Sequence, residues 1–181
     1  MNTGSSRQAE EAAMGDIPFV PYLERTRTYY STLGYPPYQW AAFDEVPFTP
    51  LKKPLTASRL ALISTAAPYR PELGDQGPGA PYNANAKFFR VYTTPLSPMP
   101  DLRISHLGYD RRHTSAEDPA CWLPIAQLID AVNDERLGSL AEKLIGVPTN
   151  RSQRVTATQD AEDALTACRE LGADIALLVP T

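Results

Sequence analysis

The richest cluster of reactive side chains lies at residues 105–113 and contains both histidines of the chain, His106 and His113. Tyr109 and Asp110 stand between them, directly after a predicted strand. Imidazole and carboxylate groups can transfer protons or orient a polar substrate, whereas this spacing is not typical of a metal site. We therefore treat His106, Tyr109 and Asp110 as candidates for substrate binding. A loop histidine held by a structural hydrogen bond is the alternative.

Two shorter polar stretches add further candidates. Ser64 and Thr65 end an apolar run, where a parallel sheet presents its ligand site. Asn150 and Arg151 lie in a polar loop after Pro148, and an arginine there can bind a carboxylate with paired hydrogen bonds. A solvated turn is the alternative for this loop.

The two cysteines, Cys121 and Cys168, lie far apart in the chain. They match neither a disulfide framework nor a CxxC pair nor a zinc site. The sequence also lacks the glycine-rich nucleotide motifs, the GxSxG motif and the HExxH motif. No metal and no bound cofactor is therefore expected in this chain.

Charge and composition narrow the expected partners. The chain of 181 residues has 17 basic and 21 acidic residues and a net charge of −4, and its basic residues form no run. This does not favour a nucleic acid or an anionic membrane surface as partner. No stretch approaches the roughly 18 apolar residues of a membrane-spanning helix, and residues 1–15 do not resemble a secretory signal. We expect a cytoplasmic protein.

The N-terminal part is rich in proline. Residues 1–16 are predicted to be a disordered tail, and residues 17–57 a helix followed by an arm rich in proline and aromatic residues. Helical spacing predicts one helix, which Gly34 can end; its apolar positions are Leu23, Thr26, Tyr30 and Leu33. The aromatic side chains of the arm are expected to be buried, with a partner interface as the alternative. They are Tyr38, Trp40, Phe43 and Phe48.

Residues 58–181 are predicted to form an incomplete α/β domain. Residues 59–65 and 173–181 are apolar runs typical of strands buried on both faces of a parallel sheet. Residues 102–105 are a further candidate strand of the sheet, and residues 88–93 a short edge strand.

Three helices are predicted between these strands. The first begins after Pro124 and has its apolar face at Ile125, Leu128, Ile129 and Val132. Capping boxes predict a short helix that begins at Ser139 and a longer one that begins at Thr156 and ends at Gly172. The apolar stripe of the longer helix is Ala161, Leu165, Cys168 and Leu171.

A helix that ends in glycine and leads into a buried strand is half of a doubly wound α/β unit. The predicted fold is therefore α/β, with an open, mostly parallel, doubly wound sheet of the Rossmann or flavodoxin type. It has an extended proline-rich N-terminal arm, and its C-terminal part is missing. The strand at residues 174–179 is expected to be central, beside residues 60–64. His106 and Asp110 are expected near its carboxyl end, at the same edge of the sheet as Thr181.

Four segments together resemble the selenoprotein B family of glycine, betaine, sarcosine and D-proline reductases. They are residues 47–51 (Pro-Phe-Thr-Pro-Leu), 59–65 (Arg-Leu-Ala-Leu-Ile-Ser-Thr), 101–110 (Asp-Leu-Arg-Ile-Ser-His-Leu-Gly-Tyr-Asp) and 172–181 (Gly-Ala-Asp-Ile-Ala-Leu-Leu-Val-Pro-Thr). The resemblance extends roughly from Tyr22 to the C-terminus, and the last two segments are the most specific.

In that family the strand that matches residues 175–181 leads directly into a selenocysteine, or into a cysteine in some paralogues. The resemblance implies that the catalytic group stands directly after Thr181 and that the chain as given is inactive. For the full-length protein it implies a subunit of a reductase that cleaves a C–N bond of a small amino-acid-like substrate. Other reductase subunits, one of them with a pyruvoyl group in some members, and a thiol reductant are the expected partners.

Two other functions stay open. Amino-acid racemases of the aspartate/glutamate type place a cysteine after each of two buried strands, and Ser64-Thr65 offers none at the first. A non-catalytic binding domain is favoured if Thr181 is a genuine terminus. If the reductase assignment is right, the last strand lacks its covering helix, and the 181-residue chain is expected to be poorly soluble or partly unfolded.

Overall fold

The computed structural model describes residues 21–70, 72, 87–104, 109, 117–149 and 152–180. The chain divides into two units, Met1–Val46 and Pro47–Thr181, which are described separately. The predicted disordered tail at residues 1–16 lies outside the described residues.

The first unit contains helix α2 (Tyr22–Thr32). The helix ends where predicted, because Gly34 adopts a φ of 78° that glycine tolerates best. The Tyr35 N–H then donates to the Tyr30 carbonyl at 3.0 Å, and the chain returns along the helix, so that the rings of Tyr30 and Tyr38 lie 5.1 Å apart. The helix has no buried residue.

The aromatic side chains of the arm are not buried, and this part of the prediction is wrong. Trp40 is 47% exposed, Phe43 74% and Phe48 90%. Prolines keep this segment extended; the rings of Tyr38 and Trp40 lie 4.9 Å apart, but neither residue is buried. The alternative, a partner interface, stays a prediction.

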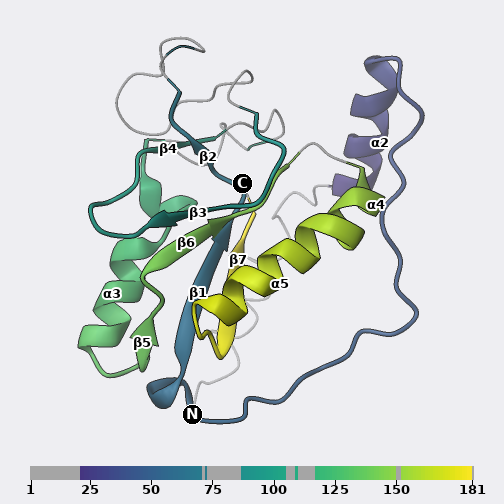
Figure 1. Ribbon diagram of the computed structural model, residues 1–181. Coiled ribbons are helices and arrows are strands. Elements are labelled where there is room, and N and C mark those ends of the chain that lie inside the picture. The colour runs from purple at the N-terminus through teal and green to yellow at the C-terminus, as the bar shows by residue number, and fades with distance from the viewer. Residues whose placement is uncertain are drawn as a thin grey trace, which may run out of the picture. The chain divides into compact units, whose positions relative to one another are not determined.

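The second unit is built on a five-stranded sheet (Figure 1). Strand β1 (Arg59–Ser64) pairs in parallel with β5 (Ser139–Leu140), β6 (Lys143–Gly146) and β7 (Ile175–Val179). Strand β3 (Tyr92–Pro95) pairs antiparallel with β6. The predicted α/β class with a mostly parallel sheet is confirmed.

The pairing partners show on which edge of β1 each strand lies. Leu60 pairs with both Leu140 and Ile175, so β5 and β7 occupy opposite edges. Ser64 pairs with residues of both β6 and β7, which also places these two strands on opposite edges. Strands β5 and β6 therefore follow one edge of β1, and β7 follows the other. The helix predicted to begin at Ser139 is wrong, because this segment forms β5 and β6.

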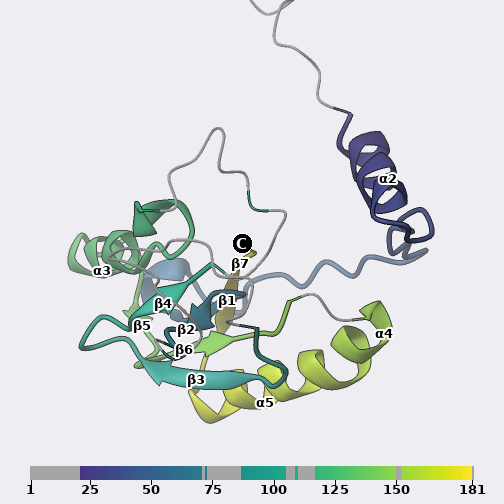
Figure 2. The same ribbon diagram turned by 90° about the horizontal axis from the view of Figure 1, so that it is seen from above.

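Helices cover both faces of β1. Helix α3 (Ile125–Asn133) forms where predicted and packs on the face that contains Leu60 and Leu62, but Ile129 of its predicted apolar face is 44% exposed. Helix α5 (Ala161–Glu170) packs on the face that contains Ala61. Because side chains alternate between the faces of a strand, β1 buries consecutive residues, as its apolar run predicted. Figure 2 shows the sheet with α3 and α5 from above.

The long helix begins earlier than predicted. Ser152 accepts a hydrogen bond from the Val155 N–H at 3.2 Å and caps α4 (Gln153–Val155). The segment Thr156–Asp160 forms a π turn that leads directly into α5. The buried stripe consists of Asp160, Ala164, Ala167 and Leu171, whereas the predicted stripe residues Ala161 and Leu165 are exposed.

Strand β7 confirms the predicted parallel pairing with β1 but not the predicted central position. Among the described strands it pairs only with β1. Ile175, Leu177 and Val179 pack against the core beneath α3, while Leu178 on the opposite face is 67% exposed. Helix α5 packs over β6 and β1 and does not cover β7.

The strand predicted at residues 102–105 is not part of the main sheet. Strand β4 (Leu102–Arg103) pairs antiparallel with β2 (Ala67–Pro68) in a separate two-stranded sheet. The predicted edge strand at residues 88–93 is found slightly later in the chain, as β3. None of the described helices has the length and apolar character needed to cross a membrane.

Because β1 is buried on both faces and β7 on one, shortening a leucine side chain should cost more unfolding free energy in β1 than in β7. Leu62→Ala removes a side chain with no exposed surface, so we expect the free energy of unfolding to fall by about 2–5 kcal/mol. Leu178→Ala, the matched change on β7, is expected to alter it by about 0.5 kcal/mol or less. Urea denaturation of both variants measures the difference, and equal costs would show that β7 is covered in solution.

Candidate functional site

The carboxyl ends of β1 and β7 lie side by side at one edge of the sheet (Figure 1). Ser64 pairs with Val179, so the two strands end at the same level. Thr65 and Pro180 are the next residues along each chain. Parallel α/β sheets bind ligands outside these ends, and the candidates Ser64 and Thr65 stand there as predicted from the sequence.

The turn that follows β1 is held by two hydrogen bonds to the buried residue Ala66. Its N–H donates to Ser64 Oγ at 3.1 Å, and its carbonyl accepts from the Tyr92 hydroxyl at 2.7 Å. Burial raises the pKa of Tyr92 above its usual range, so this phenol keeps its donor proton even in moderately alkaline solution. Sequence analysis did not select Tyr92, because its role depends on the pairing of β3 with β6.

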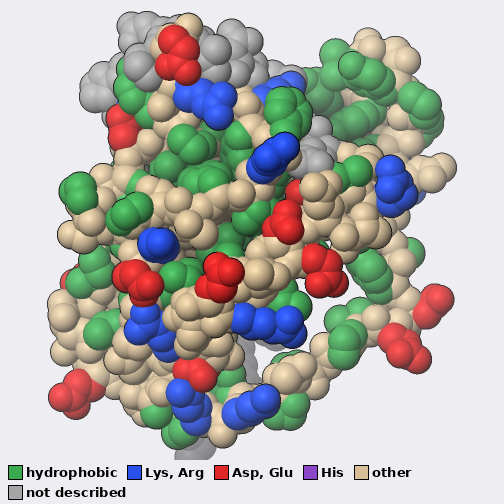
Figure 3. Space-filling model, in the orientation of Figure 1, with side chains coloured by type: hydrophobic (Ala, Val, Ile, Leu, Met, Phe, Trp, Pro, Cys, Tyr) green, Lys and Arg blue, Asp and Glu red, His purple; other side chains and the backbone are tan. Residues whose placement is uncertain are grey.

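A cavity of about 400 Å³ lies next to this turn, between β3 and the β2–β4 pair. It is lined by Pro68, Tyr69, Tyr92, Thr93, Thr94, Pro100, Asp101 and Leu102. Beneath it the guanidinium of Arg103 lies 4.2 Å from the centroid of the Tyr69 ring and forms an ion pair with Asp101. Figure 3 shows hydrophobic side chains gathered in the upper middle of this face, with acidic and basic side chains interspersed below them.

Of the remaining candidates, the structure describes Tyr109. It is half-buried and packs against the core cluster of β1 and α3. Its hydroxyl is buried and makes no hydrogen bond within the described part of the chain. His106, Asp110, Asn150 and Arg151 lie outside the described residues, as does Thr181. Their place at this edge stays a prediction.

Asp160 is a second residue that sequence analysis did not select. It is 1% exposed and ends the π turn before α5. Leu171, near the other end of the helix, accepts a hydrogen bond from Arg59 Nε at the start of β1. Asp160 precedes Leu171 by about 16 Å along the helix. One feature could have marked Asp160 in the sequence analysis, because its carboxylate follows the spacing of the buried helix stripe. In the structure it also stands in a π turn, an element that is frequent at functional sites.

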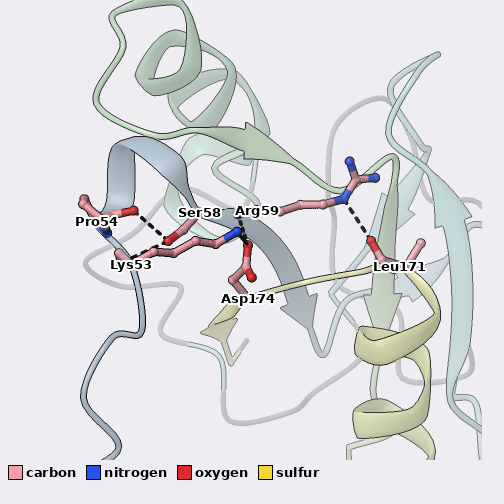
Figure 4. Close-up of polar contacts among 6 residues, drawn as sticks. All are labelled: Lys53, Pro54, Ser58, Arg59, Leu171 and Asp174. Atoms are coloured by element: carbon pink, nitrogen blue, oxygen red, sulfur yellow. Dashed lines mark hydrogen bonds and ion pairs between the residues drawn. The ribbon is translucent and has the colours of Figure 1, made fainter.

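A larger cavity, of about 530 Å³, lies at the opposite edge of the sheet. Figure 4 shows the polar contacts beside it. Asp174 Oδ2 accepts from Lys53 Nζ at 2.6 Å and from the Arg59 N–H at 2.8 Å. The hydrogen bond from Lys53 and then that from Arg59 lower the pKa of Asp174. These contacts attach the amino end of β7 to β1, away from the predicted site.

Metal binding has no support in the described segments of the chain, where no three histidine, cysteine or acidic side chains are close enough to hold an ion. Comparison of the chain with known protein families, with curated proteins and with solved structures finds no significant match. The function is therefore argued from the residues and from their geometry.

The contact between Tyr92 and Gly146 gives a prediction for the carboxyl edge. A Cβ on Gly146 would lie 1.9 Å from Tyr92 Cε1, so Gly146→Ala must displace the ring and is expected to cost about 1–3 kcal/mol of unfolding free energy. In a Tyr92→Ala background the same change should cost clearly less, because the ring is absent. A double-mutant cycle by urea denaturation measures this coupling. Equal costs in both backgrounds would contradict the contact.

The lowered pKa of Asp174 gives a prediction on acid stability. A carboxyl group whose pKa is depressed by folding stabilises the fold above its unfolded-state value, ordinarily 3.8, and loses this contribution as the pH falls through the folded-state value. Lys53→Met should bring the pKa of Asp174 closer to its ordinary value and weaken this part of the acid dependence. NMR titration of the Asp174 carboxyl measures the change. Lys52→Met is the control, and an equal shift in both variants would contradict the assigned pair.

Proposed function

We propose that this chain belongs to a subunit of a selenium- or thiol-dependent reductase that reductively cleaves a C–N bond of an amino acid or a related amine. The observation that supports this proposal is the parallel pairing of β1 with β7, whose carboxyl ends meet at Ser64 and Val179. The resemblance places the nucleophile directly after Thr181, three residues beyond the end of β7. A nucleophile there would lie beside the turn at Thr65 and Ala66.

The strand order favours the doubly wound form of the fold. The chain passes from β1 to β5 and β6 on one edge and then returns past β1 to β7 on the other. The order of the parallel strands reverses between β1 and β7, and doubly wound sheets bind their ligands at such a switch point. The strand order and the resemblance therefore both favour the carboxyl ends of β1 and β7 as the ligand site.

The proposed reaction uses side chains of this chain, a nucleophile directly after Thr181, a dithiol and groups of partner subunits. A selenolate or thiolate after Thr181 would supply the nucleophile, and a dithiol would supply the two electrons that the cleavage consumes. Thr65 and Tyr109 would contact the substrate from this chain, and the buried Ser64 would hold the turn that carries Thr65. His106 and Asp110 would orient it, and Asn150 and Arg151 would bind its carboxylate. Other subunits, one with a pyruvoyl group in some members of the family, would activate the substrate.

A racemase finds less support at this edge. That chemistry needs a cysteine at the end of each of two strands, and β1 ends in Ser64 and Thr65. Cys121 lies in the 3-10 turn Pro119–Cys121, and Cys168 lies on α5. A non-catalytic binding domain becomes the better account only if the following experiment fails.

The test compares two extended chains, one with cysteine and one with serine directly after Thr181, both carrying Cys121→Ser and Cys168→Ser. We expect the added cysteine to react with iodoacetamide near neutral pH at least about tenfold faster than the native thiols, because thiolates at such sites have lowered pKa values. The pKa values of Cys121 and Cys168 are raised, chiefly by desolvation, so the parent chain is a slow reference. With dithiol and the partner subunits, only the cysteine form should release ammonia from glycine, methylamine from sarcosine or trimethylamine from betaine, or open the ring of D-proline to 5-aminovalerate.

An added cysteine that labels no faster than the native thiols, and cleaves the C–N bond of none of these substrates, would contradict the reductase proposal. The coding sequence after the Thr181 codon is an independent check. An in-frame codon of the stop type followed by further coding sequence and a hairpin supports a selenocysteine at this position.

A further inference from the structure

Four residues lie side by side in one row across the sheet, at the level where β1 and β7 end. Tyr92 of β3 pairs with Gly146 of β6, and Gly146 pairs with Ser64 of β1. Ser64 in turn pairs with Val179 of β7. Residues directly opposite each other project to the same face of a sheet. Tyr92, Ser64 and Val179 therefore point to the face that α3 covers.

Gly146 leaves a gap in this row, and the Tyr92 ring fills it. The ring lies where a Cβ on Gly146 would stand, at 1.9 Å from Cε1 and 2.1 Å from Cζ. Phe88 supports the ring from its edge at a centroid distance of 5.1 Å. Because the ring crosses β6, its hydroxyl reaches the chain that leaves β1 and donates to the Ala66 carbonyl at 2.7 Å.

Ala66 is thereby held at both of its backbone polar groups. The N–H donates to Oγ of Ser64, the last residue of β1. The carbonyl is held from β3, two strands away. The first bond therefore ties the turn to its own strand, and the second adds a tie across the sheet from β3. The bond from Tyr92 thus supports the turn from a strand other than β1.

We propose that Tyr92 is a positioning residue for the carboxyl-edge site, where it fixes the turn after β1 and with it the place of Thr65 beside the end of β7. The role of this site in a reductase rests on the function proposed above, but the positioning itself does not. A reactive group must be held to a fraction of an ångström by residues that are themselves held in place. Tyr92 provides this support through its hydrogen bond to the Ala66 carbonyl.

The test measures how often residues 65 and 180 meet. Thr65→Cys and Pro180→Cys are introduced together in a chain with Cys121→Ser and Cys168→Ser, and disulfide formation is followed with oxidised glutathione. Both residues follow a paired position, and neighbouring strands are close enough for this bond. Tyr92→Phe keeps the ring and removes only the donor. We expect cross-linking to slow about five- to tenfold, the factor that corresponds to one lost hydrogen bond.

Two controls separate positioning from a general loss of stability. Tyr29→Phe changes an exposed tyrosine of α2 and should leave the rate unchanged. Gly138→Ala destabilises the opposite edge, because a Cβ there would lie 2.8 Å from backbone atoms of Ala57 and Ser58. It should also leave the rate unchanged at temperatures where thermal melts show every variant folded.

In the cysteine-extended chain, Tyr92→Phe should lower kcat by a similar factor and leave KM unchanged. Slower cross-linking in a chain that cleaves no substrate would keep the positioning role and remove the reductase proposal. An unchanged cross-linking rate in Tyr92→Phe, or an equal decrease in Gly138→Ala, would overturn the positioning role whatever the reductase assay shows.

Discussion

The placement of β1 determines the arrangement of the second unit, because it pairs with three of the four other described strands of the main sheet and is packed on both faces. Ala61 and Leu62, neighbours in sequence, face opposite helices and have no exposed surface. Such a strand must be apolar along its length, and its polar residues are confined to the ends. Arg59 at one end forms the contacts that attach β7 and α5, and Ser64 at the other caps the turn of the candidate site.

The positions of the two helices follow from the route of the chain around β1. The connection through α3 moves from β1 to one edge, and the connection through α5 moves in the opposite direction, past β1, to the other. Crossovers between parallel strands are almost always right-handed. Two crossovers of one hand that run in opposite directions must place their helices on opposite faces, as α3 and α5 are observed. The carboxyl ends of β1 and β7 become neighbours for the same reason, without any contact specific to the site.

Sequence analysis succeeded where local pattern and tertiary role agree. The runs that became β1 and β7, the α3 face and the Gly34 stop each depend on a few adjacent residues. The error at residues 139–146 has a physical cause. From Leu60 to Ile63 β1 advances three residues, while its partner advances five, from Leu140 to Ile145. Two extra residues therefore lie between β5 and β6. The apolar residues Leu140, Leu144 and Ile145 of this segment are spaced as on a helix, although the segment is extended. A capping box at Ser139 reinforced the error, since propensity yields to sheet pairing.

Other features of the site depend on contacts that no local pattern contains. Tyr92 matters because Gly146 faces it across a sheet whose register is set by distant segments, and Asp160 is buried because the helix begins at Ser152 and passes through a π turn. The exposure of Leu178 likewise depends on where α5 crosses the sheet. A fully apolar run such as Ile175–Val179 indicates a strand, but it cannot show whether both faces are covered.

The register of β7 connects the two edges of the sheet. A shift of one residue in its pairing would turn Ile175, Leu177 and Val179 away from the core and expose them. The apolar pattern resists this shift only weakly, because Ala176 and Leu178 on the other face are also apolar. The polar contacts of Asp174 with Lys53 and Arg59 discriminate better, since they form at one register only. Because β7 pairs with β1 continuously over five residues, a register set by Asp174 at the amino end also places Val179 beside Ser64. The geometry of the proposed site is therefore fixed from two directions: by Asp174 at the far end of β7, and by Tyr92 across the sheet.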